Sequence, residues 1–214
     1  MRGLRAYSTA VASHVRLQPY GVLGTRLTTD GGVIRKAEPP GGSIGFVDPA
    51  GLDYIQSGPS GAGGAAGAIY RFLNISEDPS FPDAVSAAIT APGHAKHHRY
   101  ALADGHVDCV HVVGPDLRTG DYNWERAVRT LATAYEGVLR ESAQLHTLRL
   151  LPISGGIFSG KFRDQLPLLT HEALTQALGR SAPAAKLDMC IFMQSEWQAF
   201  VDAGFVPAAA QSRL

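Results

Sequence analysis

The feature that most constrains the fold is an alternation of short apolar runs with segments of helical periodicity. The strand-like runs lie at 43–48, 106–114, 147–154 and 187–193, and several of them are apolar on consecutive positions, which is typical of strands covered on both faces. Helical periodicity falls between and after them, at 67–73, 123–145, 165–178 and 195–204. In the last segment we expect Ser195 to cap the helix and Gly204 to end it. Strands that alternate with helices predict an α/β layer sandwich.

Length and charge limit the classes of partner. The 214 residues suffice for one α/β domain and are too few for two. Nineteen basic residues balance nineteen acidic ones, so no overall field draws the chain to nucleic acid or to a membrane, and we expect neither partner. No run approaches the roughly 20 apolar residues of a membrane span. The basic cluster at 94–99 is interpreted as a solvated loop rather than a metal site.

The cysteines and the first residues bear on the compartment. Cys109 and Cys190 each lie in an apolar run, which favours buried thiols in a reducing, intracellular compartment and leaves no thiolate zinc site. We expect no metal and no cofactor. The first 29 residues contain arginines and no acid, a composition found in mitochondrial presequences and also compatible with a first strand. Residues 1–32 are therefore either an N-terminal extension or an added edge strand, ahead of a domain at 33–214.

Two glycine-rich turns stand where a strand is expected to end and a helix to begin, the place where ligands gather in such folds. The first is "GPSGAGGAAGAIYR", residues 58–71, and the second is "SGGIFSGKF", residues 154–162. Glycines let backbone amides approach an anion closely, and a helix N-terminus adds the positive end of its dipole. Together the turns predict an anionic ligand, such as a pyrophosphate, held between them.

The second turn also has the G-x-x-x-x-G-K frame of a nucleotide-binding P-loop. The residue after Lys161 is Phe162, which has no hydroxyl to hold magnesium, and the run at 187–193 ends without a carboxylate. We therefore reject the P-loop. A serine hydrolase built on Ser154 or Ser159 with Lys161 is a further alternative, but a serine close to a lysine is common by chance and so is not a specific signal.

Several segments together resemble a macrodomain. They are "FVDPAG" (46–51), "GGAAGAIYR" (63–71), "APGHAK" (91–96), "VHVVGP" (110–115) and "ISGGIFSG" (153–160). The stretches "LLPISGGIFSGKFRDQL" and "MCIFMQSEW" are most similar to the macrodomain of alphavirus non-structural polyproteins, so a viral origin is one possibility. The resemblance covers residues 33 to 204 and implies a three-layer α/β/α sandwich with a central mixed sheet.

The resemblance implies that the ligand is ADP-ribose, free or attached to a protein, and that the chain acts as a monomer. The first glycine loop would meet the pyrophosphate and distal ribose, and the second would wrap the diphosphate from the other side. A carboxylate at Glu38 would recognise the adenine, which Met193 and Gln194 would flank. The implied ligand-binding residues are Glu38, Gly51, Gly63, Gly64, Ala65, Ala66, Gly67, Ser154, Gly155, Gly156, Ile157, Phe158 and Gln194.

Departures from the family pattern bear on catalysis. Hydrolytic members use an asparagine where this chain has Gly51, and some use an acid where it has Ala66. Neither residue can position water or act as a base, so we assign no catalytic residue and expect weak or absent hydrolysis. Hydrolysis through Asp53, Tyr54 or Gln56 and a ligand-free interaction role remain alternatives. Asp48 and Asp53 would repel an anionic ligand unless they are turned away or paired.

Overall fold

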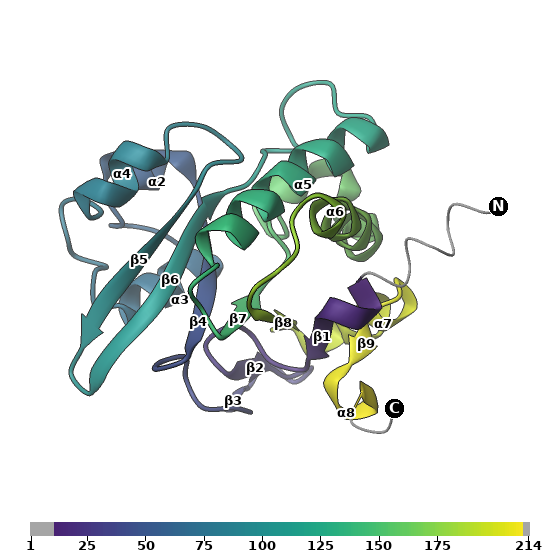
Figure 1. Ribbon diagram of the computed structural model, residues 1–214, viewed down its shortest axis with the longest axis horizontal. Coiled ribbons are helices and arrows are strands. Elements are labelled where there is room, and N and C mark those ends of the chain that lie inside the picture. Colours follow the sequence, from purple (N-terminus) through teal and green to yellow (C-terminus); the bar gives the residue numbers. More distant parts are fainter. Residues whose placement is uncertain (1–10, 212–214) are drawn as a thin grey trace.

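A computed structural model describes residues 11–211, which form one seven-stranded sheet with helices on both faces (Figure 1). The strand order is β5-β6-β4-β7-β8-β1-β9, and every neighbouring pair is parallel except β5 with β6. The strands are β1 Val15–Gln18, β4 Ile44–Ala50, β5 Ala95–Leu102, β6 Gly105–Val113, β7 Thr147–Leu150, β8 Lys186–Cys190 and β9 Val206–Pro207. A separate hairpin pairs β2 (Thr25–Leu27) with β3 (Val33–Arg35).

The helices form the two outer layers. The segments outside the sheet are α2 Leu52–Ser57, α3 Gly64–Phe72, α4 Asp83–Ala88, α5 Trp124–Glu141, η1 Ile157–Gln165, α6 Leu166–Arg180, η2 Gln194–Glu196, α7 Trp197–Asp202 and α8 Ala208–Gln211. One apolar core packs α5, α6 and α7 against residues such as Val47 and Leu148 of the sheet. A second core packs α2, α3 and α4 against the opposite face, where Phe46 and Cys109 point. The predicted three-layer sandwich with a mixed sheet is therefore confirmed.

The long helix α5 shows why these segments fold as they do. Its buried residues recur at helical spacing and include Ala127, Leu131 and Val138, which cover the sheet. The side chain of Asn123 accepts a hydrogen bond from the amide of Arg126 and so caps the helix start. Strand β7 is buried at all four positions, although two of its residues, Thr147 and Arg149, are polar.

Several local predictions differ from the structure. The basic cluster at 94–99 was expected as a solvated loop, but all of it except His94 lies in the edge strand β5. Ser195 lies inside η2 and caps no helix, whereas Gly204 follows α7 with a φ of 102° and ends it as expected. The first strand, β1, lies between β8 and β9 and so is one strand in from the edge. The presequence interpretation rests partly on residues 1–10, which lie outside the described residues.

The remaining compositional expectations concern charge and thiols. The basic side chains of β5 are neutralised, because Arg99 and His97 bind Asp108 and Lys96 lies 3.5 Å from Glu141. Both cysteines are buried free thiols, and burial raises the pKa of each. Within residues 11–211, no helix combines the length and apolar character needed to span a bilayer.

Candidate functional site

The candidate site lies at the edge of the sheet where the parallel strands end. Because β4, β6, β7 and β8 are parallel, the segments that follow them emerge at the same edge. Ala50 of β4 is level with Val113 of β6, so Gly51 and Gly114 begin adjacent loops. The segments that lead to the turns at 58–64, 114–123 and 151–156 therefore start from this edge of the sheet.

The start of α3 is open and uncapped. Gly63 precedes the helix and makes no side-chain cap, so the first amides of α3 have no intrahelical partner. A Cβ atom added at Gly61, Gly63 or Gly64 would meet no described atom within 4 Å. Gly64 also has a φ of 57°, a conformation that favours glycine. Ala65 and Ala66 complete the first turn of the helix.

Gly67 has a different role from its neighbours. A Cβ atom at this position would overlap the carbonyl oxygen of Ala62. Only glycine lets the turn that enters α3 fold back against the helix. We therefore attribute Gly67 to packing, and Gly63 and Gly64 to the open surface of the site.

The loop after β7 is held by its own turn and by the loop after β6. Ser154 is 5% exposed and has a φ of 60°, and its Oγ donates a 2.7 Å hydrogen bond to the carbonyl of Pro115. The amide of Gly155 donates within the turn, to the carbonyl of Pro152 at 3.0 Å. Gly156 has open space beyond its Cα, and Ile157 is 71% exposed. These last two residues form the accessible surface of this loop.

Residues of the rejected P-loop frame have structural roles. The chain after Gly156 continues as the 3-10 segment η1, which is kinked at Gly160, rather than as an α-helix. A Cβ at Gly160 would lie 2.7 Å from the carbonyl oxygen of Leu117. Phe162 is buried and packs edge-on against Trp124. This geometry has no place for the magnesium-binding hydroxyl of a P-loop.

Phe158 connects three loops of the site. Its carbonyl accepts a 2.9 Å hydrogen bond from the amide of Leu117, and the Arg118 guanidinium lies 4.9 Å from the centre of its ring. On the other side, a Cβ added to Gly51 would lie 3.9 Å from Phe158 Cε2 and 3.3 Å from Tyr54 Cδ2. The Tyr54 hydroxyl in turn donates to the carbonyl of Gly61 at 3.3 Å. The two glycine loops are therefore linked through Gly51 and Tyr54.

Arg118 was not identified from the sequence. It is half-exposed and forms a two-pronged ion pair with Asp116, with contacts of 2.9 and 2.7 Å. The Arg118 side-chain hydrogen bonds lower the pKa of Asp116. Arg118 lies beside Phe158 with its charge paired to Asp116, so what it can offer an anionic ligand is the Nη1 donor rather than an uncompensated positive charge. Its single sequence signal is its position after an apolar strand, in "GPDLRTG".

Asp48, which was expected to repel an anionic ligand unless paired or turned away, faces the interior. It is fully buried, and its Oδ2 lies 2.7 Å from Nδ1 of His111. The Tyr100 hydroxyl lies 2.8 Å from the other imidazole nitrogen, Nε2. Asp48 is therefore paired and turned away from the open surface, which removes the repulsion expected for an anionic ligand.

The structure does not bring Glu38 to the glycine loops. The carbonyl of Glu38 accepts a 2.9 Å hydrogen bond from Arg149, which is level with Phe46, four residues before the end of β4. The Glu38 carboxylate is 87% exposed and lies 3.7 Å from Arg35. Gln194 is exposed and begins η2 shortly after β8 ends, so it shares the sheet edge with the site.

Asp53, Tyr54 and Gln56, the residues considered for hydrolysis in the absence of an asparagine at position 51, differ in how far other groups hold their side chains in place. Gln56 Nε2 donates to the carbonyl of Ile89 at 2.7 Å and ties α2 to the end of α4. Tyr54 is held between Gly51 and Gly61, while Asp53 is exposed on the first turn of α2. Within the described residues, no group of three His, Cys, Asp or Glu side chains could hold a metal ion.

Comparisons with solved structures identify the fold. The Trypanosoma brucei macrodomain in complex with ADP has a TM-score of 0.56 and 16% identity, covering 91% of this chain and 70% of that one. The Oceanobacillus iheyensis macrodomain with ADP has a TM-score of 0.56 and 13% identity, covering 91% of this chain and 90% of that one. A structure described as alphavirus P23pro-zbd has a TM-score of 0.53 and 21% identity, covering 94% of this chain and 24% of that one.

No protein-family model matches the sequence, and no curated protein matches it either. The relationship is therefore visible in the path of the backbone and not in overall sequence similarity. The mixed seven-stranded sheet and the helices on both faces agree with it. This chain has the macrodomain fold.

Proposed function

We propose that this chain binds ADP-ribose, or a closely related nucleoside diphosphate, between the start of α3 and the loop after β7. The observation that carries the proposal is the open, uncapped helix start at Gly63 and Gly64, facing no described side chain. Free amides at a helix N-terminus suit a pyrophosphate, because they supply donors and the positive end of the helix dipole. The accessible Gly156 and the nearby Arg118 add donors from the other side.

The choice of ligand rests on the proteins with the same fold. The Trypanosoma brucei macrodomain has also been solved in complex with ADP-ribose, with a TM-score of 0.55 to this chain. Both ADP and ADP-ribose contain the diphosphate that the glycine loops would take. Glu38, which is tied to Arg149 by its carbonyl, is a weaker candidate for adenine recognition than Gln194 at the site edge.

We propose further that binding is accompanied by little or no hydrolysis. Gly51 and Ala66 have no group that could orient or activate water. The rings of Tyr54 and Phe158 stand 3.3 and 3.9 Å from where a Cβ at Gly51 would be, so they fill the space that a longer side chain would use. The Gln56 side chain is hydrogen-bonded to the backbone at the end of α4. Asp53 is the one acidic residue of α2 and so the remaining group on this helix that could act on water.

Two measurements test these statements. Calorimetric titration with ADP-ribose should give a dissociation constant in the micromolar to low millimolar range, and AMP, which lacks the diphosphate, should bind more weakly. No heat at millimolar ADP-ribose would remove the binding proposal. Incubation with a mono-ADP-ribosylated protein should leave the modification in place; release of ADP-ribose at enzymatic rates would show that the chain is a hydrolase.

A further inference from the structure

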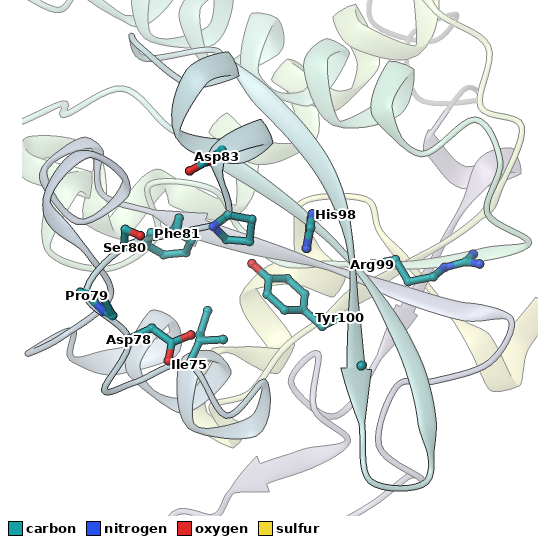
Figure 2. Close-up of a pocket in the computed structure, with 11 residues that line it drawn as sticks. Ile75, Asp78, Pro79, Ser80, Phe81, Asp83, His98, Arg99 and Tyr100 are labelled. Atoms are coloured by element: carbon teal, nitrogen blue, oxygen red, sulfur yellow. The ribbon is translucent and has the colours of Figure 1, made fainter.

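A cavity lies away from the glycine loops, beside the edge strand β5. It has a volume of about 540 Å³ and is bounded by the segment from Ile75 to Asp83 and by residues 98–101 of β5 (Figure 2). Phe81 and Pro82 supply apolar walls. None of the residues of the proposed ADP-ribose site lines it, so it is a separate feature of the surface.

The outer edge of β5 is free next to this cavity. In an antiparallel pair, alternate residues direct their main-chain groups toward the partner strand and away from it. The amide of His97 points outward, because it donates to the Glu141 carboxylate at 3.0 Å. Arg99 and Ala101 lie two and four residues after His97, so their main-chain groups point to the same side as that of His97, and both residues are exposed. Their N–H and C=O groups therefore stand on the open side of the sheet, ready to pair with another strand.

The charge that faces the cavity is negative. Asp78 and Asp83 both line it and both are exposed. Arg99 points away from them (Figure 2), and its guanidinium binds both oxygens of Asp108, at 2.9 and 3.1 Å. Burial lowers the pKa of His98, and His111 and His97 lower it further, so this imidazole is neutral at pH 7. The cavity thus presents two carboxylates with no cation of the described lining residues turned toward them.

Tyr100 adds a fixed acceptor to the same cavity. It is 7% exposed, and its hydroxyl lies 2.8 Å from His111 Nε2. In the neutral tautomer of His111 whose Nδ1 proton is directed at Asp48, Nε2 accepts a hydrogen bond from the tyrosine hydroxyl. The phenol oxygen then keeps its lone pairs for a donor from outside, and Figure 2 shows it directed between Asp78 and Asp83.

We propose that β5 binds an extended peptide whose backbone pairs with the free edge at Arg99 and Ala101 and whose arginine or lysine side chain enters the cavity. Strand addition supplies main-chain hydrogen bonds, and a pocket beside the edge supplies the choice of side chain. A guanidinium or ammonium group matches the cavity because it carries donors and positive charge, against two carboxylates and one phenol acceptor. The apolar walls at Phe81 and Pro82 suit the methylene stem of such a side chain.

The test uses the acetylated and amidated peptide Thr-Val-Arg-Val-Thr, its lysine counterpart, and the same peptide with uncharged citrulline in place of arginine. Titration calorimetry should detect binding of the two cationic peptides and at least about tenfold weaker binding of the citrulline peptide, since citrulline keeps the shape and loses the charge. In NMR spectra of the protein, the amides of Arg99 and Ala101 should shift on titration, while that of Gly63 should not.

Matched variants separate the cavity from general electrostatics. The double variant Asp78→Asn, Asp83→Asn should weaken binding of the arginine peptide at least about tenfold. Asp104→Asn removes an acidic charge from the exposed turn of the same hairpin and should leave affinity unchanged. Thermal melting of each variant checks that the fold is retained.

Three results would overturn the proposal. One is the absence of binding by both cationic peptides up to about 5 mM, which corresponds to negligible affinity. Another is unchanged affinity in the Asp78→Asn, Asp83→Asn variant. The third is equally tight binding of free arginine amide, because the cavity would then take a small cation and the strand edge would contribute nothing. Loss of ADP-ribose binding is not expected in any of these variants, so the two proposals can fail separately.

Discussion

The hydroxyl of Ser154 donates a 2.7 Å hydrogen bond to the carbonyl of Pro115, and this bond joins the loop after β7 to the loop after β6. Ser154 holds a φ of 60°, which is strained for any residue with a side chain. The hydrogen bond is buried and offsets part of that strain. One side chain thus fixes the relative position of the two loops that carry Gly156, Phe158 and Arg118.

Two substitutions at Ser154 separate the hydrogen bond from the backbone strain. Ser154→Ala should lower the free energy of unfolding by about 1–3 kcal/mol, because the carbonyl of Pro115 is left without its partner in a buried setting. Ser154→Gly loses the same bond but accepts a positive φ, so it should be less destabilised than Ser154→Ala by about 1 kcal/mol. Urea denaturation of the three proteins measures both differences. Equal stability of the two variants would show that the backbone at this position is not strained.

The open start of α3 predicts a selective loss of ligand binding. Gly63 has an extended conformation, with φ −107° and ψ −179°, that valine adopts readily, and a side chain there would enter empty space. Gly63→Val should fold normally and raise the dissociation constant for ADP-ribose at least about tenfold, equivalent to about 1.4 kcal/mol. Calorimetry with ADP-ribose provides the measurement.

Gly41→Val is the matched control for Gly63→Val. An added Cβ at Gly41 meets a single described atom within 4 Å, the carbonyl oxygen of His106 at 3.8 Å, and the residue lies outside the glycine loops. Its affinity for ADP-ribose should equal that of the unmodified chain. If the two variants behaved alike, the diphosphate would not lie against the start of α3.

The parts of the fold that the sequence predicts are those with a strong periodic signal. Strand β6 and helix α5 were predicted because their apolar residues are consecutive or recur at helical spacing. Strand β5 was missed because "AKHHRYAL" is polar at the positions that face Glu141 and Asp108. Those residues are compatible with a sheet only through partners 9 to 45 positions away, as Arg99 with Asp108 and Lys96 with Glu141 show.

The candidate site divides in the same way. The open glycines could be predicted, since a glycine turn before a helix is a local signal. The contact of Arg118 with Phe158 joins two loops that are distant in the sequence, so no local pattern indicates it. The position of Glu38 depends on Arg149, whose side chain reaches the carbonyls of Val22 and Glu38 from the middle of the sheet. The positions of Arg118 and Glu38 follow from tertiary packing, which cannot be predicted from local patterns in a single sequence.

The pair between Asp108 and its two basic partners predicts a dependence of stability on acid. Burial acts to raise the pKa of Asp108, but hydrogen bonds from Arg99 and His97 outweigh it and lower the pKa from its ordinary value of 3.8. A carboxylate with a lowered folded-state pKa stabilises the fold fully above the unfolded-state value of about 3.9 and loses that contribution as the pH falls through the folded-state pKa. The chain should therefore lose stability as the pH falls below about 4, through the folded-state pKa of Asp108.

Asp108→Asn tests this assignment. At neutral pH the variant should be less stable by about 1–3 kcal/mol, because Arg99 and His97 lose a charged acceptor. Its stability should then fall less steeply than that of the unmodified chain as the pH is lowered below about 4, as measured by urea midpoints. Asp104→Asn, in the turn of the same hairpin, should keep the original slope. A steep slope retained in Asp108→Asn would assign the acid sensitivity to other carboxylates.

A pair of glycine substitutions in helices separates a packing role from helix propensity. At an open helical position, alanine is favoured over glycine by about 1 kcal/mol. Gly179 in α6 meets no described atom within 4 Å of an added Cβ, so Gly179→Ala should stabilise the chain by roughly 0.5–1 kcal/mol. Gly67 in α3 has the carbonyl oxygen of Ala62 where the Cβ would stand, so Gly67→Ala should instead destabilise it by at least about 1 kcal/mol. Thermal unfolding of the two variants gives the signs directly, and stabilisation by Gly67→Ala would mean that the turn entering α3 does not pack against the helix as described.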